Sequence, residues 1–301
     1  MVLLKNRGGI LPLDPDQSVA IIGDFAQTPR YQGAGSSLVN APQVENFRQV
    51  FERSGIHCAG YAQGFERNGH PNAALQEEAV ELANGADVVL LFLGLDEVQE
   101  SEGLDRRHMK LAQTQINLLM ALHRANPQIV VVLASGSAVE TPWASRCQAL
   151  IWHSLSGQAG ASALLDVLTG KVNPSGKLAE TWPIRYEDNP SCKHFGGPGR
   201  TVEYREGIYV GYRYYQTADV QVSYPFGYGL SYTTFSYSDL DAAPEEVSLT
   251  VTNTGSCDGD EIVQVYIAKP DASVFRPDEE LKGFARVHLA AGESRRVTIP
   301  L

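Results

Sequence analysis

The sequence predicts an α/β fold, a mainly parallel sheet flanked by helices in an α/β sandwich, followed by a partial antiparallel β-sandwich. In the first half, short apolar runs rich in β-branched residues alternate with longer amphipathic segments, as in parallel strands covered by helices. Beyond residue 240, short segments alternate apolar and polar residues between turns, as half-buried antiparallel strands do. The 301 residues, 43% hydrophobic and 20% charged, suffice for a sizeable core.

The elements of the α/β part are expected in a regular order. Apolar runs predict strands at residues 19–22, 56–61, 88–93, 129–133 and 149–152. Amphipathic segments predict helices at residues 43–53, 73–84, 112–125 and 159–168. The third of these helices is the clearest, because Pro127 ends it and apolar residues recur at helical spacing. Its predicted core face consists of Ile116, Leu119, Met120 and His123.

The amino-acid composition of the chain changes after residue 172. Gly, Pro and aromatic residues dominate residues 173–237, which is typical of loops. Strands are expected beyond them at residues 247–253, 261–268 and 295–299. We therefore expect an α/β sandwich at 1–185, a connecting segment at 186–240 and a fibronectin type III-like β-sandwich at 241–301. A complete sandwich of that kind has roughly 100 residues and about seven strands, so we expect an incomplete one whose last strand lacks a partner, in a gene product that continues past Leu301.

Charge and cysteine usage exclude several classes of partner. The formal net charge of −11 disfavours nucleic acid and anionic membrane surfaces, because both are negatively charged. The apolar runs are far shorter than the roughly 20 residues that span a bilayer. No signal peptide is recognised, so a cytoplasmic location is expected. The four cysteines lie far apart without a CxxC pair, so neither a metal site nor a disulfide framework is expected, and no cofactor is predicted.

Charged residues follow the strand expected at residues 88–93, and they are Glu100, Glu102, Asp105 and Arg106. Ligands of α/β sheets bind beyond the carboxyl ends of strands. Arg106 can hold one carboxylate ionised while a second keeps a raised pKa, and such a separation suits acid/base work on a glycosidic bond. The alternative is a solvated acidic loop in which Asp105 and Arg106 form a surface ion pair.

Other patterns are less specific. The Gly-rich stretch Tyr31–Ser37 follows a strand and can hold a phosphate or line a sugar pocket, but GxGxxG and a Walker lysine are absent. A surface loop is the alternative there. His153 lies near serines without a GxSxG elbow, so we interpret it as a hydrogen-bonded residue at a strand end. The aromatic residues from Tyr204 to Tyr232 can stack on sugars or pack between domains.

Several motifs together resemble glycoside hydrolase family 3, the family of β-glucosidases and β-xylosidases. They occur in family order over nearly the whole chain, and the ordered set is far more specific than any one motif. The matching stretches are Val2–Asn6, Leu11–Leu13, Glu102–Arg106, Gly157–Gly160, Asp166–Leu168, Asn173–Leu178, Thr181–Pro183, Tyr204–Tyr215 and Pro225–Phe235.

The resemblance implies a retaining enzyme that releases β-linked sugars from non-reducing ends. Family members combine a TIM-like barrel bearing an aspartate nucleophile, an α/β sandwich bearing the acid/base glutamate, and usually a fibronectin type III-like domain. Glu102 falls on the acid/base position before Gly-x-Asp-Arg, and Glu100 is a second acidic residue beside it. The implied substrate-binding residues are Gln32, Ser36, Ser37 and Arg106.

The chain also departs from the family pattern. A (β/α)₈ barrel of about 250 residues does not fit in this length, and the nucleophile motif, Ser-Asp followed by an aromatic residue, does not occur. We therefore expect two partners: a β-linked oligosaccharide or glucoside, and the missing (β/α)₈ barrel of the parent protein. Because a retaining hydrolase needs two carboxylates, we predict that the isolated chain is inactive. The alternatives are a non-catalytic carbohydrate-binding or scaffolding module and, on the α/β pattern alone, a nucleotide-binding domain.

Overall fold

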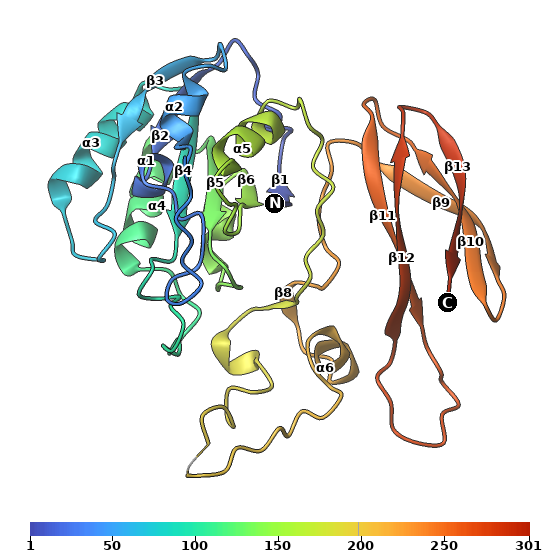
Figure 1. Ribbon diagram of the computed structural model, residues 1–301. Coiled ribbons are helices and arrows are strands. Elements are labelled where there is room, and N and C mark those ends of the chain that lie inside the picture. The colour runs from blue at the N-terminus through green and yellow to red at the C-terminus, as the bar shows by residue number, and fades with distance from the viewer. Residues whose placement is uncertain (198) are drawn as a thin grey trace. The chain divides into compact units, whose positions relative to one another are not determined.

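The computed structural model describes residues 1–197 and 199–301. The chain divides into two compact units, Met1–Val172 and Asn173–Leu301 (Figure 1). The first is an α/β sandwich and the second contains antiparallel sheets, which confirms the predicted fold class. The predicted segment boundaries at residues 185 and 240 stay a prediction.

The first unit is built on a sheet with the strand order β1-β6-β5-β4-β2-β3. Its strands are β1 Val2–Asn6, β2 Ser18–Ile22, β3 His57–Ala62, β4 Val88–Gly94, β5 Ile129–Ala134 and β6 Ala149–Trp152. Strands β2 to β6 are parallel to their neighbours, and β1 pairs antiparallel with β6 at one edge. Every residue of β4 and β5 is buried, which accounts for their uninterrupted apolar sequences.

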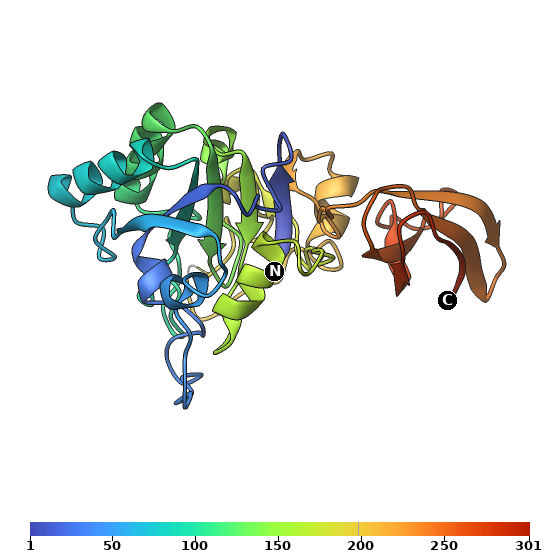
Figure 2. The ribbon, with the colours of Figure 1, turned by 90° about the horizontal axis from the view of Figure 1, so that it is seen from above.

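Helices cover both sides of this sheet (Figure 2). On one side, α3 Ala73–Asn84 packs against α4 Gln113–Ala125, and the short 3₁₀ helix Pro142–Arg146 lies beside α4. On the other side, α2 Phe47–Phe51 packs against α5 Gly160–Leu168 and α1 Asp24–Gln27. With both faces covered, ligands reach the sheet at its edges, and the carboxyl edge of parallel strands is the usual one.

The helix predicted at residues 43–53 is wrong at both ends. The observed helix is limited to Phe47–Phe51. Asn46 is its N-cap, and the Asn46 side chain accepts a hydrogen bond from the Gln49 N–H at 2.9 Å. Gly55 follows with a φ of 80°, a left-handed conformation that turns the chain toward β3.

The predicted core face of α4 is also partly wrong. The buried residues of this helix are Gln115, Leu118, Leu119, Ala121 and Leu122, whereas Ile116, Met120 and His123 are only half-buried. Gln115 is inside because its side-chain amide bonds the N–H of Gly94 at 2.9 Å and the carbonyl of Gly94 at 2.8 Å. Gln115 is polar, and a count of apolar residues therefore places it on the solvent side of the helix, although its amide is buried because it bonds the backbone of a strand. The predicted core face is rotated away from the observed one for this reason.

The second unit starts with short elements. β7 Trp182–Pro183 pairs antiparallel with β8 Val222–Tyr224. The 3₁₀ helix Tyr186–Asp188 and α6 Tyr212–Thr217 lie between them in the chain. Trp182 is fully buried against Tyr224, with ring centroids 5.9 Å apart, so part of the aromatic cluster forms a core.

The rest of the second unit is antiparallel. β9 Phe235–Ala242, β10 Glu246–Asn253 and β13 Ser294–Pro300 form one sheet in the order β13-β10-β9. β11 Gly259–Ile267 and β12 Glu280–Leu289 form another. Alternate side chains of these strands share one core: Val247, Leu249, Val251, Val263, Val287, Leu289, Val297 and Ile299.

The expectation that the last strand lacks a partner is wrong. β13 pairs with β10 from Glu246–Pro300 to Thr252–Ser294, because the alternating apolar residues of both strands face the same core. Strands β1, β9 and β12 were not predicted from the sequence. Nearly every residue of β9 is exposed, so its apolar signal is weak. None of the helices in the described residues has the length and apolar character needed to cross a membrane.

Candidate active site

Two loops meet at the carboxyl edge of the first unit's sheet. One lies between α1 and α2, and the other lies between β4 and α4 (Figure 1). Ala34 and Ser101 form an isolated parallel bridge, and the Glu102 N–H donates to the Ala34 carbonyl at 3.2 Å. Because β2 and β4 are adjacent and parallel, segments that leave their carboxyl ends are brought side by side.

Glu102 lies on the second loop and is exposed to solvent. Its Oε2 atom accepts a hydrogen bond from the Ser36 N–H at 2.8 Å and another from the Ser36 hydroxyl. These donations favour the ionised carboxylate, so the Ser36 hydroxyl and then the Ser36 N–H lower the pKa of Glu102 below its ordinary value. The sequence analysis expected a raised pKa for one carboxylate of this loop, and for Glu102 the direction is opposite.

Gly35 permits the close approach of the two loops. Its φ is 94°, in the left-handed region that a residue with a Cβ rarely adopts. A Cβ at this position would lie 2.7 Å from the Cβ of Glu102, well inside van der Waals contact. The residue beside Ser36 is therefore restricted to glycine by the backbone conformation and by the position of Glu102.

Glu100 has a very different environment, although it is only two residues away. Its side chain is 11% exposed, and its Oε2 lies 2.5 Å from Nη1 of Arg30, which is 1% exposed. The Gly136 N–H donates to the same oxygen at 2.8 Å, and the Ser137 hydroxyl donates to the other. Glu100 is therefore a largely enclosed, charge-paired carboxylate, and Glu102 is the exposed one.

Two of the other predicted substrate-binding residues, Gln32 and Arg106, bond groups other than the Glu102 carboxylate. The Gln32 side-chain amide accepts from the Val39 N–H at 2.8 Å and donates to the Val39 carbonyl at 3.1 Å, so Gln32 holds its own loop together. Ser37 is exposed. Arg106 donates to the Ser137 hydroxyl at 2.8 Å and lies 3.8 Å from Glu100. The structure thus brings Ser36 to Glu102, while substrate-binding roles for all four stay predictions.

His153 is a half-buried residue that directly follows β6. Its Nε2 lies 3.1 Å from the Gly160 carbonyl, and its Nδ1 lies 3.5 Å from the Ser156 hydroxyl. Burial lowers the pKa of His153 to about 4 because the charged imidazolium is poorly solvated there. The ring is neutral at ordinary pH, with a hydrogen-bonding role like the one expected for a strand-end histidine.

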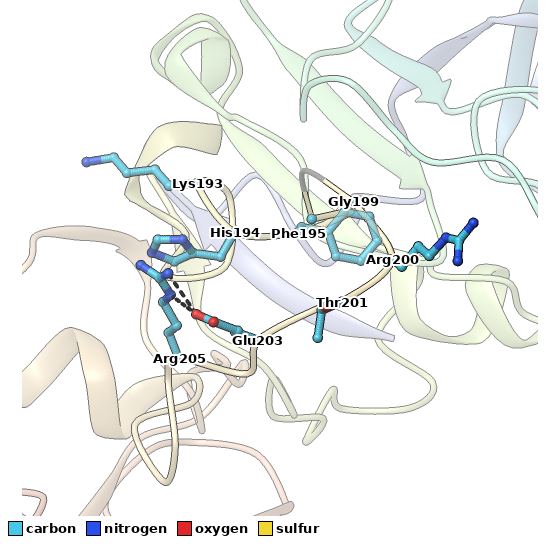
Figure 3. Close-up of a pocket in the computed structure, with 9 residues that line it drawn as sticks. Lys193, His194, Phe195, Gly199, Arg200, Thr201, Glu203 and Arg205 are labelled. Carbon is cyan, nitrogen blue, oxygen red and sulfur yellow. Dashed lines mark hydrogen bonds and ion pairs between the residues drawn. The ribbon is translucent and has the colours of Figure 1, made fainter.

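The second unit contains two hollows that the sequence analysis did not predict. One has a volume of about 630 Å³ and four basic residues in its lining, of which Arg205 pairs with Glu203 at 2.7 Å (Figure 3). The other has a volume of about 620 Å³ and is lined by tyrosines. Its polar groups bond one another: Tyr237 donates to Glu261 at 2.8 Å and Tyr266 to Gln264 at 2.7 Å. Loop sequences without periodicity give no signal for such hollows.

Comparison with known families defines the class of this protein. The glycosyl hydrolase family 3 C-terminal domain matches residues 1–232, and the fibronectin type III-like domain matches residues 261–301. The first match spans the whole α/β sandwich, including both loops of the site. The chain belongs to glycosyl hydrolase family 3.

Individual relatives have two kinds of activity in their names. The chain is 45% identical to an exo-α-(1→6)-L-arabinopyranosidase of Bifidobacterium breve, over 100% of this chain and 42% of the relative. It is 43% identical to thermostable β-glucosidase B of Acetivibrio thermocellus, over 100% of this chain and 41% of the relative. It is also similar to the crystal structure of a Bifidobacterium adolescentis family 3 β-glucosidase, with a TM-score of 0.96, 46% identity, and coverage of 100% of this chain and 45% of that one. The chain spans less than half the length of these relatives.

Proposed function

We propose that this chain supplies the general acid/base, Glu102, of a retaining glycosidase that removes β-linked sugars from non-reducing ends. In the first step Glu102 donates its proton to the leaving oxygen while a carboxylate attacks the anomeric carbon. In the second step Glu102 takes a proton from the water that displaces the enzyme carboxylate. The activities named for the relatives support this reaction class.

The difference between Glu100 and Glu102 is the observation that carries this assignment. Glu100 is paired with Arg30 and its side chain is only 11% exposed, which disfavours contact of its carboxylate with a substrate. Glu102 is exposed, and its carboxylate accepts hydrogen bonds from Ser36 of the adjacent loop. An acid/base residue must reach a leaving group and change its protonation state during turnover, and Glu102 meets the first condition.

The second condition requires the pKa of Glu102 to rise when substrate binds. In the present arrangement Ser36 lowers that pKa. A sugar that displaces the Ser36 hydroxyl removes the largest cause of the shift. A second carboxylate about 5 Å away, as retaining enzymes have, raises the pKa further by like-charge repulsion.

We further propose that the nucleophilic carboxylate belongs to a region of the whole protein outside these 301 residues, and that the chain alone is inactive. The substrate class follows from the relatives. An α-L-arabinopyranoside has the anomeric arrangement of a β-D-galactopyranoside but no hydroxymethyl group. A single mechanism therefore serves both activities, and the remainder of the protein selects the sugar.

A chimaera tests the proposal. These 301 residues replace the matching 45% of the Bifidobacterium adolescentis β-glucosidase, and the product is assayed on aryl β-glucoside, β-xyloside and α-L-arabinopyranoside. We expect activity in the chimaera and none in the isolated chain. Glu102→Gln should lower kcat on a poorly activated aryl glycoside by about 10²–10⁴-fold, the usual contribution of acid/base catalysis.

The control variant is Glu97→Gln, which alters an exposed carboxylate of the same loop, paired with Arg67 at 3.1 Å. It should leave kcat unchanged. Azide should restore turnover of an activated aryl glycoside in Glu102→Ala, because a small anion can enter the vacated space. A chimaera that keeps full activity without the Glu102 carboxylate would falsify the assignment and favour a carbohydrate-binding or scaffolding role.

A further inference from the structure

A buried ionic network lies beneath the loop that carries Glu102. Its centre is Glu100, whose carboxylate lies 2.5 Å from Arg30 Nη1. Arg30 also donates from Nη1 to the Leu95 carbonyl and from Nη2 to the Glu100 carbonyl, both at 2.9 Å. The Arg30 guanidinium thus bonds three groups of the loop: the Leu95 carbonyl, the Glu100 carbonyl and the Glu100 carboxylate.

The same carboxylate reaches a third segment of chain. The Gly136 N–H and the Ser137 hydroxyl, which follow β5, both donate to Glu100. Arg106 Nη1 lies 3.8 Å from Glu100 and donates to Ser137 at 2.8 Å and to the Ala138 carbonyl at 3.1 Å. Glu100 therefore joins the segments that leave the carboxyl ends of β2, β4 and β5.

The network and the acid/base site share the same two loops. Arg30 belongs to the loop that continues to Ala34 and Ser36. Ala34 accepts from the Glu102 N–H at 3.2 Å, and Ser36 donates to the Glu102 carboxylate. The two loops are thus joined at the base by Arg30 and Glu100 and at the tip by the contacts of Glu102.

We propose that Glu100, together with Arg30, is a positioning residue that fixes the direction of the Glu102 carboxylate, an inference that rests on the proposed function of Glu102. Glu100 transfers no proton in this account. Its charge and its hydrogen bonds from Arg30, Gly136 and Ser137 hold the loop in one conformation, and a charge-paired carboxylate with little exposure suits that role better than it suits catalysis. A displacement of a catalytic group by about 1 Å can cost on the order of 10²-fold in rate.

The first test is kinetic and uses the chimaera. Glu100→Gln keeps the shape of the side chain and removes its charge. We expect kcat on a poorly activated aryl glycoside to fall about 100-fold, with little change in KM. Azide should not restore the turnover of Glu100→Gln, because the Glu102 carboxylate is still present and repels the anion. Azide should restore the turnover of Glu102→Ala. Arg30→Lys keeps the charge but loses the forked donors, so its kcat should be intermediate.

The second test uses the 301-residue chain and needs no activity. Carbon-13 NMR of the glutamate carboxyls follows the titration of Glu102. In the parent chain Glu102 should titrate below ordinary glutamate, and in Glu100→Gln its pKa should rise toward the ordinary value as the loop moves away from Ser36. If Glu100→Gln does not fold, Ser137→Ala removes one donor to Glu100 and leaves the ion pair, and it should show smaller changes in the same directions.

The outcomes separate this inference from the proposed function. Unchanged kcat and an unchanged Glu102 titration in Glu100→Gln, with large losses in Glu102→Gln, overturn the positioning role alone. Azide rescue of Glu100→Ala but not of Glu102→Ala overturns both, because it assigns the acid/base role to Glu100. Loss of kcat in both variants, with rescue limited to Glu102→Ala, supports the positioning role.

Discussion

At the scale of single residues, two glutamates separated by one serine have opposite environments. Glu100 is largely enclosed and paired with Arg30, and Glu102 is exposed and bonded by Ser36. The same residue type thus has two environments in one loop, because exposure and partners differ.

Ser36 should control the titration of Glu102. Its hydroxyl and N–H lower the pKa of that carboxyl, so Ser36→Ala, which removes the larger cause, should raise the pKa toward the ordinary glutamate value. In the chimaera, the alkaline limb of the pH profile of kcat/KM reports loss of the proton from the general acid of the free enzyme. This limb should move to higher pH. NMR titration of Glu102 in the isolated chain provides the direct measurement. A limb that stays in place or moves to lower pH contradicts the prediction.

His153 should make the stability of the first unit depend on pH. Burial lowers its folded pKa to about 4, below the unfolded value of about 6.5. Between these values the unfolded state binds more protons, so stability is complete above about pH 6.5 and is lost as pH falls toward 4. The total contribution is about 3 kcal/mol at about 1.4 kcal/mol per pKa unit.

Urea unfolding at pH 7 and pH 5 measures this effect. The free energy of unfolding should fall with pH in the parent chain, and the part of the slope that His153 causes should be absent from His153→Gln. Equal slopes in the two proteins would show that other groups cause the pH dependence.

At the scale of elements, the site depends on how two loops approach each other. Gly35→Ala should disturb this approach, since its φ is 94° and a Cβ would lie 2.7 Å from that of Glu102. We expect a loss of stability of about 1–3 kcal/mol from the backbone strain and at least a tenfold loss of kcat in the chimaera.

Gly55→Ala is the matched control for that change. Gly55 also has a left-handed φ, of 80°, but its Cβ would meet open space. This variant should lose stability through backbone strain and keep its kcat. Equal kcat in the two variants would mean that the contact between Gly35 and Glu102 has no functional importance.

At the scale of the whole molecule, the two units have separate cores. The sheet core of the first consists of β4, β5 and their neighbours, while eight aliphatic residues form the sandwich core of the second. Separate cores predict two calorimetric transitions. Val251→Ala removes two methyl groups from a fully buried side chain and should destabilise the second unit by about 2 kcal/mol.

That substitution should lower the midpoint of one transition and leave the other in place. Val274→Ala, at a position that is 68% exposed in the same unit, should shift neither. A single transition that moves as a whole in Val251→Ala would show that the two units unfold cooperatively.

The sequence by itself determined the fold class, the parallel strands and the position of the acidic loop after the strand β4. Strands that are buried on both faces are continuously apolar, and strands with one face in solvent alternate apolar and polar residues. The burial of a strand can therefore be predicted from its own residues. The same patterns failed for β1, β9 and the buried Gln115, where strand pairing or a backbone hydrogen bond between distant residues overrides the local signal.

Only the tertiary structure distinguished Glu100 from Glu102. The sequence motif places Glu102 before Gly-x-Asp-Arg but gives no sign of the partners of either carboxylate, and Arg30 lies 70 residues before Glu100. Their separate roles arise when adjacent parallel strands bring the two loops together, so that Arg30 meets one carboxylate and Ser36 meets the other. The exposure of both carboxylates and the lowered pKa of Glu102 depend on those long-range neighbours, which no local pattern of residues contains.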